Sequence, residues 1–351
     1  MKICIFSRAF YPAVGGLERI AEILANQAAG FGHEVEVVTD KLGISDIDDQ
    51  QFPFKITRTH EYRYRVQAFK RADVVLFMNV SLHGMLAAIA SRKPIVLSHH
   101  GIYIGRGLIG RSLEMLKRQL TWFYPNISVS QFVANNMPAA SVVIPNAYDN
   151  TIFKQPELRI RIRDFVFCGR LVSDKGVDVC LQAFSEVVKR FSDSTLTIVG
   201  DGPERQTLMT IAQSLGVSGQ VRFTGALSRH ELVAELQRHA CMVVPSLCKE
   251  AFGIVALEGI ACCDTVIVSC RGGLPEAVAE CGYVVDPTVN GMSSAMTVVV
   301  RARRGGMLLP GQPSERVRKA HLARHTPSGV THQYLYVAEQ ALLNKKTRSR
   351  Q

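Results

Sequence analysis

Short apolar runs alternate with helical stretches along this chain, and that alternation limits the available folds more than any other feature. Runs such as residues 74–78 and 242–244 are apolar at every position, which is typical of strands buried on both faces of a parallel sheet. The predicted strands are residues 3–6, 34–39, 74–78, 95–98, 127–129, 142–144, 165–168, 196–199, 221–223, 242–244, 266–269 and 283–285. The predicted helices between them are residues 17–29, 81–91, 107–123, 176–191, 204–215, 229–239 and 252–262.

The pattern occurs twice, with a break over residues 145–156. We therefore predict an α/β protein with two doubly wound, Rossmann-like domains. They would span residues 1–150 and 151–325, and residues 326–351 would form a C-terminal helix and a basic tail. In such sheets ligands bind beyond the carboxyl ends of the strands, so the loops that follow the strands are the candidate sites.

Composition excludes several classes of protein. Of 351 residues, 47% are hydrophobic and 20% are charged, a balance that supports packed cores rather than disorder. No apolar run reaches the ~18–20 residues of a membrane-spanning helix, and the apolar start of the chain is too short for a signal peptide. The nine cysteines show neither C-x-x-C nor a zinc-ligand spacing. We therefore expect a cytoplasmic protein in a reducing compartment, with no metal site.

The positive charge is concentrated near the end of the chain. Residues 301–351 hold 11 Lys and Arg against 2 Asp and Glu, so they carry +9 of the net charge of +11. Such a segment favours anionic surfaces, either acidic lipid headgroups or nucleic acid. Ordinary solvated charge explains it equally well.

The first candidate loop contains Gly15 and Gly16, between a predicted strand and a predicted helix. Glycines permit positive φ and close approach of the backbone to a ligand. The start of the next helix offers unpaired N–H groups and partial positive charge, which suit a phosphate. Ordinary turn chemistry is the alternative, and the absence of G-x-G-x-x-G argues against a dinucleotide.

The second candidate loop places two cations after a predicted strand. Arg170 follows the strand directly, and Lys175 is predicted to open the next helix. A guanidinium fork and a mobile ammonium together suit a pyrophosphate. Both could instead be exposed surface cations. A cation at a helix N-terminus is unfavourable unless an anion joins it, which favours the functional interpretation.

The third candidate loop holds two carboxylates eight residues apart, Glu250 and Glu258. On one helix that spacing brings both to the same side. A carboxylate within the apolar run around Glu258 needs hydrogen-bond donors, which sugar or ribose hydroxyls would supply. The alternative is a capping Glu250 and a Glu258 paired with an arginine.

Seven pieces in order resemble the retaining nucleotide-sugar glycosyltransferases of family 4, which have the GT-B fold of two Rossmann-like domains facing across a cleft. The resemblance covers residues 1–40 and 144–287 most strongly and is weak after residue 290. The pieces are Phe10-Tyr11-Pro12 to Gly15-Gly16, His99-His100-Gly101, Ile144-Pro145-Asn146, Gly169-Arg170-Leu171 with Lys175-Gly176, Val199-Gly200-Asp201-Gly202-Pro203, residues 250–258 and residues 271–276.

The resemblance implies roles for these residues. Gly15 and Gly16 would approach the donor pyrophosphate, and Arg170 and Lys175 would clamp it. Glu258 would accept the ribose hydroxyls, and Glu250 would hold hydroxyls of the transferred sugar. His100 would lie near the reacting centre and the acceptor, with His99 turned inward. Backbone amides at the helix start would reach the sugar and phosphates, and they belong to Phe252, Gly253, Ile254 and Val255.

The resemblance also implies an activity. The chain would move a hexose from a UDP- or GDP-sugar to a saccharide or lipid-linked acceptor in cell-envelope polysaccharide synthesis, such as that of lipopolysaccharide. The transfer would retain anomeric configuration without metal or cofactor. Asp46-Ile47-Asp48, which superficially resembles the metal-binding D-x-D of the other glycosyltransferase fold, is interpreted as a solvated loop.

Three alternatives stay open. The first is a GT-B nucleotide-sugar epimerase or phosphorylase, and the second is a catalytically silent partner subunit. The third is a basic nucleic-acid-binding protein, which is disfavoured because no nucleic-acid-binding fold is recognisable.

Two basic, apolar segments of the first domain, residues 58–71 and 106–124, are candidates for a lipid-bearing acceptor. The second combines leucines, Trp122 and Phe123 with four cations, as an interfacial helix does. It would place the protein peripherally on the inner face of the plasma membrane, although a half-buried helix has the same pattern.

One departure from the family is Cys262-Cys263-Asp264, where a turn glycine is missing and the following loop would shift.

Overall fold

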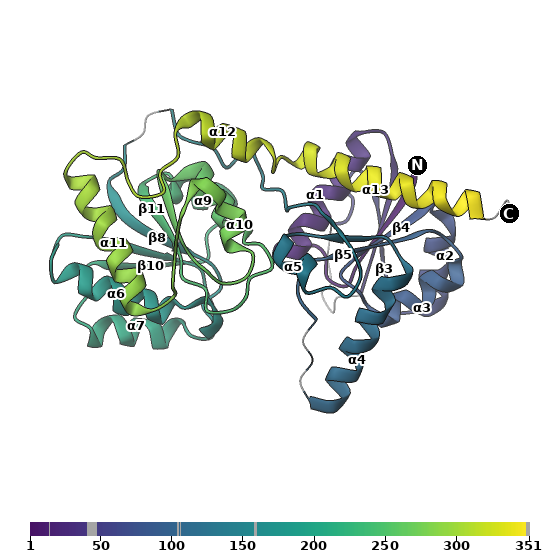
Figure 1. Cartoon of the computed structure of the whole chain (residues 1–351), viewed down its shortest axis with the longest axis horizontal. Coiled ribbons are helices and arrows are strands. Elements are labelled where there is room, and N and C mark those ends of the chain that lie inside the picture. Colours follow the sequence, from purple (N-terminus) through teal and green to yellow (C-terminus); the bar gives the residue numbers. More distant parts are fainter. Residues whose placement is uncertain (14, 41–47, 104, 106, 158–159, 349–351) are drawn as a thin grey trace. The chain divides into compact units, whose positions relative to one another are not determined.

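The computed structural model describes the chain except for residues 14, 41–47, 104, 106, 158–159 and 349–351 (Figure 1). The chain divides into two compact units. The first consists of Met1–Ala147 with Pro327–Gln351, and the second is Tyr148–Thr326.

The first unit is built on a seven-stranded parallel sheet with strand order β3-β2-β1-β4-β5-β6-β7. The strands are β1 (Lys2–Ser7), β2 (Glu34–Thr39), β3 (Lys55–Arg58), β4 (Val74–Met78), β5 (Ile95–His99), β6 (Asn126–Ser128) and β7 (Val142–Val143). The helices are α1 (Gly16–Gly30), α2 (Tyr62–Arg71), α3 (Leu82–Ser91), α4 (Gly107–Leu120), α5 (Gln131–Asn135) and α13 (Pro327–Arg348), with a 3₁₀ turn over Thr121–Phe123.

Aromatic packing holds the first sheet to its helices. Phe6 on β1 contacts Phe77 on β4 and Phe69 on α2, with ring centroids 5.0 and 5.9 Å apart. Helix α3 approaches this cluster closely because a Cβ at Gly84 would overlap the rings of Phe6 and Phe77. The C-terminal helix α13 packs on α1, β4 and β5 of the same unit (Figure 1).

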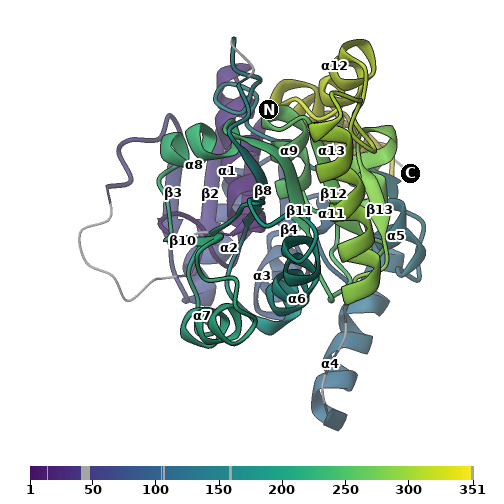
Figure 2. The ribbon, with the colours of Figure 1, turned by 90° about the vertical axis from the view of Figure 1, so that its left-hand side faces the viewer.

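The second unit is built on a six-stranded parallel sheet with strand order β10-β9-β8-β11-β12-β13. Helices α6 and α11 pack against each other beside this sheet (Figure 2). The strands are β8 (Arg163–Cys168), β9 (Leu196–Val199), β10 (Val221–Gly225), β11 (His239–Val244), β12 (Thr265–Ser269) and β13 (Tyr283–Val285). The helices are α6 (Val177–Val188), α7 (Arg205–Ser214), α8 (Arg229–Leu236), α9 (Ile254–Cys262), α10 (Leu274–Val278), α11 (Val289–Arg304) and α12 (Glu315–Ala323).

Every strand predicted from the sequence is present, and one further strand, β3, was not predicted. Strand β3 has the sequence KITR and lies at the edge of its sheet, so it lacks the apolar run by which the buried strands are recognised. The predicted helix over residues 229–239 is too long, because His239 already belongs to β11. Helices α2, α5, α10, α11 and α12 were also missed.

The turn after α9 is made without glycine. Cys263 ends the helix in an extended conformation, with φ −92° and ψ 174°. The guanidinium of Arg318 on α12, which is 2% exposed, donates to the backbone carbonyls of Ile260, Cys263 and Asp264. A buried cation therefore satisfies the carbonyls at the C-terminus of α9, where the helix dipole favours positive charge.

Replacing this cap should destabilise the second unit. Arg318→Met keeps most of the buried volume but leaves three buried carbonyls without their donor, which costs about 3 kcal/mol. We expect the melting temperature to fall by roughly 5–10 °C in calorimetry.

The matched control is Lys319→Met, because Lys319 is the next residue on α12 and its side chain is exposed. It should change the melting temperature by less than ~2 °C. Equal melting temperatures for Arg318→Met and wild type would contradict the capping role.

Candidate functional site

Four loops meet at the carboxyl edge of the second sheet because β9, β8, β11 and β12 are neighbours in it. Backbone hydrogen bonds join the loops to one another. Leu171 N–H donates to Asp201 O at 2.9 Å, which links the loops after β8 and β9. Leu247 N–H donates to Asp174 O at 2.9 Å, which links the loops after β11 and β8. Most of the sequence-predicted donor residues therefore lie on one connected surface.

Two glycines allow these loops to approach so closely. Gly200 has φ +134°, and a Cβ there would overlap the carbonyl oxygen of Gly169. Gly272 has φ +68°, and a Cβ there would overlap the carbonyl oxygen of Glu250. Any other residue at these positions would push the loops apart, so both glycines are required by the site's shape.

Arg170 and Lys175 both lie on the loop after β8. The Arg170 side chain is exposed and makes no ion pair with the residues that the structure describes. The prediction that Lys175 opens a helix is wrong. Lys175 ends a 3₁₀ turn over Ser173–Lys175, and α6 begins only after Gly176, whose φ of +67° turns the chain. Lys175 therefore lies two residues before the first residue of α6 and not within its first turn.

An ion pair joins the cation of one loop to the carboxylate of another. Lys175 Nζ lies 2.5 Å from Glu250 Oε1, and the Ser246 hydroxyl donates to the same oxygen at 3.0 Å. Burial alone would lower the pKa of Lys175, but the Glu250 carboxylate more than offsets it, so the pKa is raised. Lys175 is therefore a full positive charge at neutral pH, held in place by Glu250.

Glu250 and Glu258 do not share a helix, so the prediction that one helix brings both to the same side is wrong. Glu250 lies in the loop, and α9 begins only at Ile254. Glu258 lies inside α9 and is half-buried near the end of β8. Burial first, and then the Glu258 carboxylate, raises the pKa of the Cys168 thiol to about 12. Both carboxylates thus lie at the same sheet edge, but on different elements.

The N-terminus of α9 faces this region through Gly253, which has φ +105° and precedes the first helical residue, Ile254. Phe252 is buried, with its ring 5.5 Å from that of His325. The N–H groups of Ile254 and Val255 belong to the first turn and have no intrahelical acceptor. They can therefore bind an anion at this end of α9.

In the first unit, the two glycines after β1 do not adopt positive φ as expected. Gly15 is extended, with φ −173°, and Gly16 is the first residue of α1. A Cβ at Gly15 would overlap the Glu18 carboxylate, which folds over the helix start. Val14 lies outside the described residues. The turn therefore uses neither glycine in a left-handed conformation.

His99 and His100 end β5 and face different surroundings. His99 is fully buried, as predicted, with Nε2 2.9 Å from Asn126 Oδ1 and Nδ1 2.8 Å from the Tyr103 hydroxyl. His100 is half-buried, and its backbone N–H donates to Asn79 Oδ1 at 2.7 Å. Burial, and then His99, lower the pKa of His100 to about 3. The His100 ring is therefore neutral at physiological pH.

Four residues of the two sites were not predicted: Ser246, Asn79, Ser98 and Tyr334. Ser246 follows β11 and binds Glu250. Asn79 follows β4 with φ +65° and binds His100. Ser98 is a buried hydroxyl in the apolar run of β5, a signal that could have identified it. Tyr334 lies 236 residues further along the chain, so no local signal points to it.

Several cations of the basic C-terminal segment, residues 301–351, are bound to carboxylates or backbone carbonyls of the second unit. Arg303 pairs with Asp164, and Arg304 pairs with Asp193. Arg318 is the buried cap of α9. These cations are therefore not available as a free basic arm.

Two basic residues of the predicted acceptor segment 58–71 form ion pairs with carboxylates of the same unit. Arg58 pairs with Asp49 at 2.7 Å and Arg65 with Asp40 at 2.6 Å.

Asp46 and Ile47 of the D-x-D-like motif lie outside the described residues. Within the described part of the chain, no group of three His, Cys, Asp or Glu side chains could hold a metal, and no helix is long and apolar enough to cross a bilayer.

Helix α4 is unusual because none of its residues is buried (Figures 1 and 2). It projects from the first unit and exposes Leu108 and Ile109 by 84% and 79%. Phe123, in the 3₁₀ turn that follows, is 74% exposed. Arg106, at the start of this predicted segment, lies outside the described residues.

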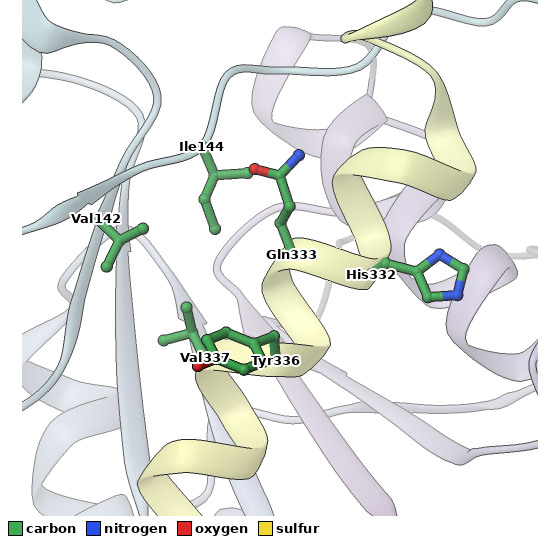
Figure 3. Close-up of a pocket in the computed structure, with 6 residues that line it drawn as sticks. All are labelled: Val142, Ile144, His332, Gln333, Tyr336 and Val337. Carbon is green, nitrogen blue, oxygen red and sulfur yellow. The ribbon is translucent and has the colours of Figure 1, made fainter.

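A separate hollow of about 350 Å³ lies between β7 and α13 in the first unit (Figure 3). It is lined by Val142, Ile144, His332, Gln333, Tyr336 and Val337. The His332 side chain points away from the other labelled residues (Figure 3), and its ring packs on that of Phe31, which follows α1, with the ring centroids 4.2 Å apart. The hollow therefore presents no cation that would bind a diphosphate.

Two protein-family models match the chain. The model described as "Glycosyltransferase Family 4" matches residues 14–151, and the model described as "Glycosyl transferases group 1" matches residues 149–299. The chain belongs to the family 4 glycosyltransferases, so the predicted family is confirmed.

A curated relative agrees with this assignment. A GDP-mannose-dependent alpha-(1-6)-phosphatidylinositol monomannoside mannosyltransferase of Mycolicibacterium smegmatis is 33% identical over 233 residues. That match covers 60% of this chain and 61% of that protein, so the chain spans about three fifths of the relative's length.

Solved structures extend the likeness to the whole fold. Sucrose-phosphate synthase from Thermosynechococcus elongatus is 19% identical, with a TM-score of 0.79 over 98% of this chain and 99% of that chain. HepE of Anabaena in complex with UDP is 17% identical, with a TM-score of 0.81 over 97% and 100%. These likenesses confirm the predicted GT-B fold class of two parallel-sheet α/β domains.

The neutral His100 has a consequence for acid stability. An unfolded histidine has a pKa of about 6.5, so below that pH the unfolded chain binds a proton that the folded chain does not bind until about pH 3. Stability is therefore full above pH 6.5 and is lost as pH falls. We expect His100 to lower the free energy of unfolding by about 1–2 kcal/mol between pH 7 and pH 5, measured by urea unfolding.

The variant His100→Gln should show a correspondingly weaker pH dependence. The control His83→Gln, at an exposed position of α3, should keep the wild-type dependence. Identical pH dependences for His100→Gln and wild type would contradict the assignment of a neutral His100.

Proposed function

We propose that this chain is a retaining glycosyltransferase that moves a hexose from a nucleoside diphosphate sugar to a lipid-linked saccharide acceptor. The observation that carries the proposal is the carboxyl edge of the second sheet. There Arg170, the Lys175–Glu250 ion pair and the N-terminus of α9 lie on loops that are hydrogen-bonded to one another.

The diphosphate is the group that this edge suits best. An exposed guanidinium and a charged ammonium can both donate to phosphate oxygens, and the first N–H groups of α9 add partial positive charge. As the bond between the anomeric carbon and the phosphate oxygen breaks, negative charge grows on the diphosphate. Arg170 and Lys175 stabilise that charge, so the reaction needs neither metal nor cofactor.

The two carboxylates accept hydrogen bonds from hydroxyl groups of the donor. Glu258, half-buried beside β8, accepts hydrogen bonds from the ribose hydroxyls. Glu250, which already holds Lys175, accepts them from the transferred sugar. On the first unit, the resemblance to the family assigns Gly15 and Gly16 to the pyrophosphate and His100 to the acceptor side. The acceptor oxygen attacks the anomeric carbon on the face that the diphosphate leaves, and its proton passes to the diphosphate.

The mannosyltransferase relative favours GDP-mannose as donor and a phosphatidylinositol-linked mannoside as the kind of acceptor. UDP-sugars are the alternative, because HepE was solved with UDP. A lipid-linked acceptor requires the enzyme to work at a membrane surface. We assign that contact to α4, whose exposed Leu108 and Ile109 would enter the cytoplasmic leaflet while Arg111 meets anionic headgroups.

The donor assignment predicts a ligand-specific rise in stability. A ligand at 100 times its Kd adds about 2.7 kcal/mol, which calorimetry detects as a higher melting temperature. We expect GDP and GDP-mannose to raise the melting temperature more than UDP and UDP-glucose.

Lys175→Ala and Glu258→Ala should each lower kcat/KM for transfer by about 10²–10³, because each removes a preorganised contact to the donor.

Lys189→Ala is the matched control, since Lys189 lies just after α6 and its ion pair with Glu186 is exposed. It should retain the wild-type kcat/KM. Stabilisation by UDP-sugars alone would reassign the donor, and full transfer activity of Lys175→Ala would contradict the site.

The membrane assignment predicts binding to vesicles through α4. The double variant Leu108→Glu with Ile109→Glu removes two apolar side chains that would leave water on binding. We expect it to weaken cosedimentation with vesicles rich in anionic phospholipid by at least tenfold. High salt should weaken binding of the wild type by screening the basic residues.

The control is Leu308→Glu, because Leu308 is 81% exposed but belongs to the second unit. It should sediment like the wild type. Failure of the wild type to bind anionic vesicles even at low salt would contradict a membrane role for α4.

A further inference from the structure

A line of three polar side chains runs from the C-terminal helix to His100. The Tyr334 hydroxyl on α13 lies 2.8 Å from Ser98 Oγ on β5, and Ser98 Oγ lies 2.9 Å from His100 Nε2. Ser98 is completely buried and Tyr334 is 3% exposed. The line therefore passes through the core of the first unit and ends at the carboxyl edge of its sheet.

Two proton orders run along the line; a third, in which Ser98 Oγ accepts from both Tyr334 and His100 Nε2–H, leaves the Ser98 proton without an acceptor among the described residues. In the first, Tyr334 donates to Ser98 and Ser98 donates to His100 Nε2, so the ring proton sits on Nδ1. In the second, His100 Nε2–H donates to Ser98 and Ser98 donates to Tyr334. The phenol proton is then left without an acceptor among the described residues. A buried donor without an acceptor is costly, so the first order is preferred.

The charge states of the two ends agree with the first order. Burial raises the pKa of Tyr334, so the phenol keeps its proton. Burial, and then His99, lower the pKa of His100 to about 3, so the ring has one proton to place. Among the described residues, His100 Nδ1 has no hydrogen-bond partner, so the N–H at that position is left for a ligand.

We propose that Ser98 and Tyr334 are positioning residues that hold His100 as its Nδ1–H tautomer, which makes the ring a hydrogen-bond donor to the substrate and not a base. The catalytic part of this inference rests on the proposed function, because it places a sugar substrate beside His100. The tautomer itself depends only on the first unit. A neutral donor at this point stabilises an oxygen of the substrate, while the proton of the acceptor hydroxyl leaves with the diphosphate.

The tautomer can be read directly from ¹⁵N spectra of the full chain labelled at histidine. Comparison with His100→Gln identifies the signals of His100. We expect Nδ1 to carry the proton and Nε2 to be unprotonated, with no change between pH 5.5 and pH 8. A proton on Nε2 in the wild type would overturn the proposal.

Ser98→Ala removes the donor to Nε2, so we expect the Nε2–H tautomer to become the major form. Tyr334→Phe removes the donor to Ser98, so the Ser98 hydroxyl can either donate to His100 Nε2 or accept from it. Both tautomers of His100 should then be populated. Ser98→Thr keeps the hydroxyl and should restore the wild-type spectrum. An unchanged tautomer in folded Ser98→Ala, as judged by circular dichroism, would also overturn the proposal.

The control variant is Tyr336→Phe, two residues along the same helix. Tyr336 is 62% exposed, and its hydroxyl has no hydrogen bond to the residues that the structure describes. Tyr336→Phe should leave the spectrum and the transfer rate at wild-type values. A tautomer change in Tyr336→Phe equal to that in Tyr334→Phe would show a general effect of α13 and would overturn the specific role of Tyr334.

Transfer kinetics test the catalytic part. We expect Ser98→Ala and Tyr334→Phe to lower kcat by about tenfold, the effect of one lost hydrogen bond in the transition state, with the Kd of the nucleotide sugar unchanged. Wild-type kcat in both variants, despite the altered tautomer, would overturn the role of His100 as a donor. If the wild type neither bound nor turned over any nucleotide sugar, the proposed function would fail while the spectra still decided the tautomer.

Discussion

The contact between the loop after β8 and the loop after β11 is the interaction on which the candidate donor site depends. Lys175 on one loop and Glu250 on the other form an ion pair, and Leu247 donates a backbone hydrogen bond back to Asp174. The strands that carry these loops are adjacent and parallel, so both loops leave the same sheet edge. The site is therefore a product of sheet topology, and its charges belong to loops that the backbone already holds together.

The surroundings of the two histidines in the first unit are organised by buried hydrogen bonds instead. His99 is hydrogen-bonded to Asn126 and Tyr103. His100 is hydrogen-bonded to Ser98, which is in turn hydrogen-bonded to Tyr334. The last of these residues comes from α13, which packs on β5 although it is the final helix of the chain. The C-terminal helix therefore completes the first unit and the surroundings of its candidate acceptor-side histidine.

The sequence predicted the fold well where packing leaves a local signal. Fully buried strands such as β4 are apolar throughout, so they were recognised, whereas the polar edge strand β3 was not. The candidate donor residues stand out in the sequence because most of them follow a buried strand. Their backbone states do not, since neither the 3₁₀ turn that ends at Lys175 nor the extended Gly15 leaves a pattern in the sequence. The pairing of Ser98 with Tyr334 has no local signal, because it joins elements that are far apart in sequence.

The central claim is that the carboxyl edge of the second sheet binds a nucleoside diphosphate. A crystal structure of the full chain with GDP or UDP tests it most directly. The account predicts phosphate oxygens within about 3 Å of the Arg170 guanidinium, the Lys175 ammonium and the first N–H groups of α9. A diphosphate bound at any other surface, with Lys175 still paired only to Glu250, would contradict it.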